Sequence, residues 1–416
     1  NLILLFLGLL LATIGQAQIA KTVNLTTAGT LSTVLTSDEK STVTNLTITG
    51  IIDARDFKTM RDSMSVLSVI DLSGATVNEY IGTLGTNGTV SITYPSNTIP
   101  ENGFYFHTAL TTITLPSTLT AIGRKAFFSL YNLRTVIIPS SVTFIGDQAF
   151  RGCEVLASID LPDELETLDD WAFYDCTSLL AIDIPSKVTT LREMTFKGCS
   201  AMKTVKLPQL LTTIGYGVFQ GCSSLATINL DSAITSIGTM AFSGTALKDV
   251  VLPSSLEIIG ESAFKWCFSL TSVSIPASVT SIGNYAFTYS PGSIHIDAEN
   301  PNYSSIDGVL FDKSQSTLIH CPVSMSGSYT IPKTVTTIDL SAFEQCRDLT
   351  AITLPSSLIT IKNFAFKDCS KLTTISIPSS VKYIGSSAFY FCKALTSFYA
   401  NPVTPVDLTI QTSVFG

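Results

Sequence analysis

Apolar residues recur along this chain with a period of 23 residues. Each period contains a phenylalanine, usually preceded by a small residue, within the pattern A-F-x-x-C-x-x-L-x-x-I-x-I/L-P-x-x-V/L-x-x-I-G. A dozen copies in register indicate an internal repeat, and a repeat of this length decides the fold. The anchor phenylalanines are Phe104, Phe127, Phe150, Phe173, Phe196, Phe219, Phe242, Phe264, Phe287, Phe343, Phe366 and Phe389.

The spacing within one repeat predicts its local structure. The alternation at the end of L-x-x-I-x-I predicts a short strand that points Ile inward and Ser, Thr or Asp outward. The proline that follows has no N–H group and ends the strand, and the I-G step lets the backbone bend. One repeat has too few apolar side chains to offset the entropy of ordering its residues, so repeats must stack. The sequence therefore predicts a solenoid with a parallel sheet on one face and short strands, turns and helical turns on the other.

The repeats over residues 101–416 resemble the BspA-like class of leucine-rich repeats, found on secreted and surface proteins of bacteria. The resemblance implies a leucine-rich-repeat solenoid at the cell surface, and attachment to host matrix proteins or to other cells as its function. The chain departs from the pattern at Asp231, where Pro is expected, at Thr245, in a repeat one residue short, and at Lys362, in place of Gly. None of these departures changes an inward apolar position.

One step between anchors, from Phe287 to Phe343, is 56 residues long and contains an insertion at about residues 291–330. Residues 312–315 separate two alternating runs, 309–311 and 317–320, which predicts a hairpin. The resemblance implies the same hairpin. The insertion is either a loop that the solenoid tolerates or a segment that contacts a ligand.

The two ends of the chain depart from the repeat. Residues 1–17 form an apolar run too short to span a bilayer and are interpreted as a signal peptide, the alternative being a buried strand or helix. Residues 18–100 are expected to form an N-terminal cap with irregular repeats, with strands at 46–50 and 67–74 and a helix at 53–64 capped by Asp53. Phe415 begins another anchor, so the C-terminus of the solenoid is expected to be truncated.

Composition narrows the range of partners. Charged residues make up 13% of the chain, the net charge is −8 and the isoelectric point is about 4.9. Nucleic acids and anionic membranes both favour basic surfaces, so neither is an expected partner. No membrane span is expected either, because no other stretch has the apolar length that a spanning helix needs.

Eight of the nine cysteines occupy the same position of the repeat. Stacked rungs would hold their Cβ atoms about 4.8 Å apart, whereas a disulfide prefers about 3.8 Å. Buried reduced thiols are therefore expected, with a few strained bridges or metal binding as alternatives. A line of thiols does not converge on one point as zinc ligands do, so neither a metal nor any other cofactor is expected.

Only three histidines could serve as a catalytic base. His107 occupies the cysteine position of its repeat, while His295 and His320 belong to the insertion. No nucleophile elbow, phosphate-binding loop, zinc motif or calcium loop accompanies them. No catalytic residue is therefore assigned, and a hydrolase at the insertion remains only an alternative.

Residues 160–170 contain six acidic side chains. Glu164 lies 23 residues before Lys187, and Asp169 lies 23 residues before Arg192, so both pairs are expected to meet on adjacent rungs. Charge pairing explains the cluster, and the alternative is a calcium site.

The outward strand positions are the expected recognition surface, because a solenoid presents one long face. Most of them carry Ser or Thr, but four consecutive rungs place Asp160, Asp183, Lys206 and Asn229 in one column. These four residues are the candidate ligand contacts, although a merely solvated face would look the same. Trp171 and Trp266 flank anchors and are interpreted as packing residues of the turns rather than sugar platforms.

The predicted function is therefore an exported cell-surface module for protein interaction or adhesion, without enzymatic activity. Its partners would be proteins or glycans of the host matrix or of neighbouring cells. A glycan-binding component of nutrient capture and a structural spacer are the alternatives.

Overall fold

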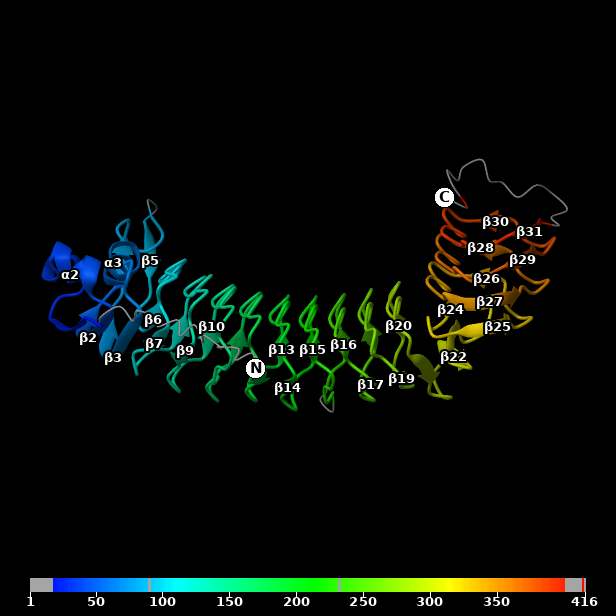
Figure 1. The fold of residues 1–416 in the computed structure, drawn as a ribbon. Helices are drawn as coiled ribbons and strands as arrows, with labels where there is room; N and C mark the ends of the chain where they lie inside the picture. The colour runs from blue at the N-terminus through cyan, green and yellow to red at the C-terminus, as the bar shows by residue number, and fades with distance from the viewer. Residues whose placement is uncertain (1–17, 89–90, 231–232, 401–413, 415–416) are drawn as a thin grey trace, which may run out of the picture.

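The computed structural model describes residues 18–88, 91–230, 233–400 and 414, and it shows one long array of stacked rungs (Figure 1). The proposed signal peptide, Asp231 and Phe415 lie outside these residues. The solenoid that the periodicity predicts, and that the resemblance gives as a leucine-rich-repeat solenoid, is the fold of the chain.

The L-x-x-I-x-I segments form the first row of parallel strands. On β12, the side chain of Ile182 is buried while those of Ala181 and Asp183 are exposed, as the alternation predicts. The row starts with β1 (Ala20–Leu25), β2 (Asn45–Ile52), β3 (Val69–Val77), β7 (Thr112–Thr114) and β9 (Thr135–Ile137). It continues with β12 (Ala181–Asp183) and β14 (Thr204–Lys206), then β17 (Asp249–Val251), β19 (Ser272–Ile275) and β21 (Ser293–Ile296), then β25 (Ser326–Thr330), β27 (Asp348–Thr353), β29 (Thr374–Ile377) and β31 (Ser397–Ala400).

The residues just before the I-G bend form a second row of parallel strands, mostly two residues long. Its first part is β6 (Thr98–Ile99), β8 (Ala121–Ile122), β10 (Phe144–Ile145) and β11 (Thr167–Leu168). Its second part is β13 (Thr190–Leu191), β15 (Thr213–Ile214), β16 (Ser236–Ile237), β18 (Ile258–Ile259) and β20 (Ser281–Ile282). Its third part contains β26 (Thr337–Ile338), β28 (Thr360–Ile361) and β30 (Tyr383–Ile384). The two rows enclose the apolar core.

The anchor phenylalanines stack into a ladder inside the array. Consecutive rings lie 5.0–5.8 Å apart, centroid to centroid, with interplanar angles of 2–14°. The residues two before and two after each anchor have positive φ, as at Gln148 (56°) and Gly152 (74°) around Phe150. Their N–H groups and that of the anchor donate to the next rung: Gln148 to Asp170, Phe150 to Ala172 and Gly152 to Tyr174, over 2.8–3.0 Å. The turn side of the solenoid is therefore bonded rung to rung.

The cysteine position of the repeat is a hydrogen-bonding slot. The Sγ of Cys153 lies 3.2 Å from the carbonyl oxygen of Phe127 in the preceding rung, and the same contact recurs in most other copies. Where Ser290 replaces Cys, its Oγ donates to the carbonyl of Phe264 over 2.7 Å. His107 fills the same slot in the first repeat, with its Nε2 3.0 Å from the carbonyl oxygen of Leu67. The described cysteines are all free thiols.

The N-terminal segment extends the first row of strands and adds three helices: α1 (Leu31–Val34), α2 (Ser37–Thr42) and α3 (Ala54–Ser63). Asp53 caps α3, as predicted, by accepting a hydrogen bond from the N–H of Arg55. Arg61 near the end of α3 donates to the carbonyls of Thr86 and Asn102 and so ties the helix to the repeats. A hairpin of β4 (Tyr80–Gly82) and β5 (Ile92–Tyr94) lies beside it.

The insertion contains the predicted hairpin, in which β23 (Val309–Asp312) pairs antiparallel with β24 (Thr317–His320). β22 (Tyr303–Ile306) pairs antiparallel with the other edge of β23, and β24 begins the third part of the second row by pairing with β26. The apolar core consists of two clusters that meet at the insertion. Leu310 packs in the cluster that contains the preceding repeats, whereas Val309 and Phe311 pack in the cluster that contains the C-terminal repeats. The array turns sharply at the insertion, so the C-terminal repeats stack in a different direction from the others (Figure 1).

Candidate functional site

The four candidate contact residues all lie on the outer side of the first row. Asp183 on β12 and Lys206 on β14 are opposite each other in register, with 3.8 Å between Oδ2 and Nζ. Asp160 and Asn229 occupy the equivalent positions of the neighbouring rungs and are exposed. Their segments, however, do not form strands, so this row is less continuous than the pattern predicts.

A hollow of about 530 Å³ lies beside the pair of Asp183 and Lys206. Its walls come from the turns of three consecutive rungs, those that follow Asp160, β12 and β14, and they include Leu161, Pro185, Pro208 and Leu210. Leu210 is 64% exposed, so the hollow combines apolar surface with the charges of Asp163, Asp183 and Lys206.

The structure adds two apolar residues to this column that the sequence analysis did not select. Ile137 on β9 is 55% exposed and Val251 on β17 is 74% exposed. Ile137 lies 23 residues before Asp160 and Val251 lies 22 residues after Asn229, so the repeat register could have identified both. We call residues 137, 160, 183, 206, 229 and 251 the outward column.

The charge pairs predicted for the acidic segment are present. Glu164 is bonded to Lys187, and Asp169 lies 3.4 Å from Arg192. Among the described residues no group of three or more His, Cys, Asp or Glu side chains is arranged to hold a metal ion. Two of the six acidic side chains are therefore paired with a cation on the adjacent rung.

A cluster of aromatic and cationic side chains covers part of the turn side and was not predicted. The guanidinium carbon of Arg151 lies 5.4 Å from the ring centre of Phe128, 5.0 Å from that of Trp171 and 4.5 Å from that of Tyr174. Trp266 stacks on Tyr289 at 6.0 Å. Both tryptophans have positive φ beside an anchor and pack against neighbouring rungs, as their interpretation as turn residues requires.

The two histidines of the insertion have different environments. His295 is exposed on β21, next to Ser274 of β19 in the first row. His320 is buried at the end of β24, and burial lowers the pKa of its imidazole to about 4. One histidine thus faces solvent on the first row, and the other lies inside the junction formed by the insertion.

The family model of the BspA type leucine rich repeat region matches this chain at residues 97–226, 192–318 and 324–415, in six copies. These matches cover more than half of the 416 residues. The chain belongs to the BspA-type leucine-rich repeat family. No curated protein matches its sequence.

This chain is similar to solved structures of bacterial proteins. A leucine-rich repeat protein from Bacteroides ovatus is 27% identical, with a TM-score of 0.54, over 75% of this chain and 83% of that one. A leucine rich cell surface protein from Faecalibacterium prausnitzii is 26% identical, with a TM-score of 0.45, over 78% of this chain and 88% of that one.

In this BspA-type solenoid the core positions recur in every rung, while the outward positions vary in charge and size. The inward Ile182 and Val205 are both buried, whereas the residues that follow them are Asp183 and Lys206. No helix in residues 18–88, 91–230 or 233–400 is long and apolar enough to cross a bilayer. The outward column is therefore a part of the BspA-type repeat in which the side chains differ from rung to rung.

Proposed function

We infer that this protein is an exported, non-catalytic module of the bacterial cell surface that binds other macromolecules, with a protein as its principal ligand. The observation that carries the proposal is the outward column, which runs without a gap over six rungs and ends in an exposed apolar residue on each side. Extended faces of this kind are the binding surfaces of repeat proteins.

The chemistry of the column supports a protein ligand. Ile137 and Val251 offer apolar contacts, while Asp160, Asp183 and Lys206 fix orientation through charge. The side chains of Asp183 and Lys206 are each more than three-quarters exposed. Their ion pair therefore contributes little to stability, and both charges remain accessible to a partner. Export rests on the apolar run at residues 1–17 and on the family.

The proposal is tested by a binding screen of the purified chain against immobilised fibronectin, fibrinogen, mucin and a glycan array at two salt concentrations. We expect saturable binding to a protein ligand. Charge reversal in Asp183→Lys or in Lys206→Glu should weaken this binding by roughly tenfold. The double variant again has two opposite charges, so it should recover part of the lost affinity if the partner contacts both residues together.

The matched control is Asp348→Lys, which breaks an exposed pair with Lys371 of the same 23-residue separation in the C-terminal repeats. It should leave binding unchanged. An equal loss of binding in Asp348→Lys and in the Asp183 or Lys206 variants would show that the outward column is not part of the interface. Binding confined to sugars would instead move the protein to the glycan-capture class, and absence of any binding would support a structural spacer.

A further inference from the structure

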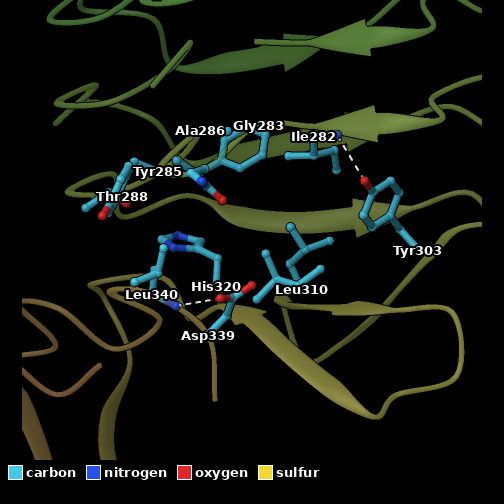
Figure 2. A pocket seen from close by; sticks show the side chains of 13 residues that line it. Ile282, Gly283, Tyr285, Ala286, Thr288, Tyr303, Leu310, His320, Asp339 and Leu340 are labelled. Carbon is cyan, nitrogen blue, oxygen red and sulfur yellow. Dashed lines mark hydrogen bonds between the residues drawn. The ribbon is translucent and has the colours of Figure 1, made fainter. Parts of the chain in front are cut away.

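A cavity of about 220 Å³ lies at the junction where the insertion interrupts the array. Residues 282–288 of the last regular rung form one side, and His320, Asp339 and Leu340 form the other (Figure 2). The cavity exists because the next anchor after Phe287 is displaced by the insertion. Phe287 therefore faces His320, at 6.2 Å between ring centres, instead of another phenylalanine.

The interruption also leaves backbone donors without acceptors. In the preceding rung, the N–H groups of Ser262, Phe264 and Trp266 donate to the carbonyls of the rung that follows, over 2.8–3.1 Å. The equivalent donors in the last regular rung are Tyr285, Phe287 and Tyr289, and among the described residues none of their N–H groups has an acceptor.

Two of these donors, at Tyr285 and Phe287, belong to residues that line the cavity. Tyr285 and Tyr289 have φ values of 59° and 66°, the left-handed conformation that makes the N–H groups of the regular rungs point the same way. Aligned backbone N–H groups of this kind create a positive potential that favours an anion. Unpaired backbone donors are rare inside proteins, which marks this rung as one that a ligand can complete.

The side chain of His320 is a second polar group without a partner in the described part of the chain, in addition to the backbone N–H groups. Its side chain is 7% exposed, and its Nε2 has no hydrogen-bond partner among the described residues. Figure 2 shows the imidazole between Tyr285 and Thr288 on one side and Asp339 and Leu340 on the other. A buried imidazole nitrogen with no partner is costly unless a ligand or water satisfies it.

The remaining lining sets the size and charge of the ligand. Leu310, Ile319 and Phe287 provide an apolar wall, so part of the ligand is hydrocarbon. Asp339 also lines the cavity, with its Oδ1 held by Lys362 at 2.7 Å and by the N–H of Leu340. The negative charge of Asp339 disfavours a ligand that carries more than one negative group. At about 30 Å³ for each water-sized atom, the volume accommodates roughly seven non-hydrogen atoms.

We propose that this cavity binds a small aliphatic monocarboxylate, whose carboxylate accepts hydrogen bonds from the N–H groups of Tyr285 and Phe287 and from Nε2 of His320, and whose alkyl chain packs against Leu310 and Ile319. The site is separate from the outward column. Binding would join the regular rung to the insertion and so stiffen the sharp turn of the array.

The test is a titration of the full chain with butyrate, followed by NMR of the three histidine side chains and of ¹⁵N-labelled Tyr and Phe amides. We expect saturable shifts of His320 and of the amides of Tyr285 and Phe287, with no change at the exposed His295. His320→Leu removes one donor to the carboxylate and should weaken binding by roughly tenfold or more, whereas His295→Ala should not change it.

Two further arms decide the chemistry. Ile319→Phe, a side chain that is only partly buried, should fill the cavity and abolish binding even if His320→Leu fails to fold. Butyramide and inorganic phosphate at matched ionic strength should bind more weakly than butyrate. Equal binding of butyramide would show that no anion site exists, equal binding of phosphate would refute the monocarboxylate, and absence of saturable shifts with butyrate would overturn the proposal altogether.

Discussion

The hydroxyl of Tyr289 donates a hydrogen bond of 2.6 Å to Oε1 of Glu344, across 55 residues of chain and across the insertion. Glu344 is almost fully buried and also accepts from Nζ of Lys367 at 2.8 Å. This contact joins the last rung before the insertion to the first regular rung after it. Burial raises the pKa of the Tyr289 phenol, and the hydrogen bond to Glu344 raises it further, so the phenol stays protonated as a donor.

Tyr289→Phe tests how far this bond holds the junction together. Hydrogen bonds to charged groups contribute about 1.5–3 kcal/mol, and Lys367 still compensates Glu344, so we expect a loss near the lower limit, about 1.5 kcal/mol. Urea unfolding measures the loss, and amide hydrogen exchange should locate it in residues adjoining the insertion. Tyr285→Phe is the control, because its hydroxyl has no hydrogen-bond partner among the described residues.

His320 should make stability depend on pH. Its pKa of about 4 in the folded chain lies below the ordinary value of 6.5, because burial disfavours the charged imidazole. The folded state therefore binds fewer protons, so stability is fully present above pH 6.5 and falls as the pH drops towards 4. The loss amounts to about 3 kcal/mol. His320→Leu should remove this component, measured as the difference between wild-type and variant unfolding free energies at each pH.

The comparison between wild type and variant cancels the contribution of other groups, such as His107, whose pKa burial also lowers. His295→Ala should leave the pH profile as it is, since that side chain is exposed. If wild type and His320→Leu differ in unfolding free energy by the same amount at neutral pH and at pH 4, then His320 is protonated in the folded state without cost and is therefore solvated.

The phenylalanine ladder should carry a large share of the stability of each rung. Phe196 is fully buried and stacks at 5.6 Å on Phe173 and at 5.8 Å on Phe219. Phe196→Ala removes both contacts and leaves a cavity, at an expected cost of about 3–5 kcal/mol. Phe196→Leu keeps most of the volume and should cost less. Urea unfolding of both variants measures the difference, and equal losses would mean that volume does not matter at this position.

The thiols should differ in reactivity according to burial. Burial raises the pKa of Cys153 and Cys222 to about 12 and that of Cys267 to about 11, so these groups stay protonated at neutral pH. Cys392 is the one described cysteine that is partly exposed, and a hydrogen bond from Cys369 lowers the pKa of its thiol. A thiol reagent should therefore label one cysteine quickly in the native protein and all nine after unfolding.

Cys392→Ser should abolish the fast phase and leave the slow labelling of the other eight cysteines unchanged. A fast phase that persists would assign the reactive thiol to another rung and would show that the array opens locally. Fewer than nine labelled cysteines after unfolding without a reductant would indicate disulfides.

The sequence by itself determined the repeating part of this protein. In a solenoid, residues one period apart are neighbours in space, so periodicity alone predicted the strand positions, the inward side chains and the pairs of Glu164 with Lys187 and Asp169 with Arg192. The same rule could have placed Ile137 and Val251 in the outward column.

Only the tertiary structure decided what happens where the period breaks or where contacts cross it. The insertion shifts the register, so nothing in the spacing places His320 against Phe287 or Tyr289 against Glu344. The cluster of Arg151 with Trp171 depends on left-handed backbone conformations at non-glycine residues, which leave no mark in the sequence. Hydrogen bonds between rungs impose those conformations, and such bonds form only once the rungs have stacked.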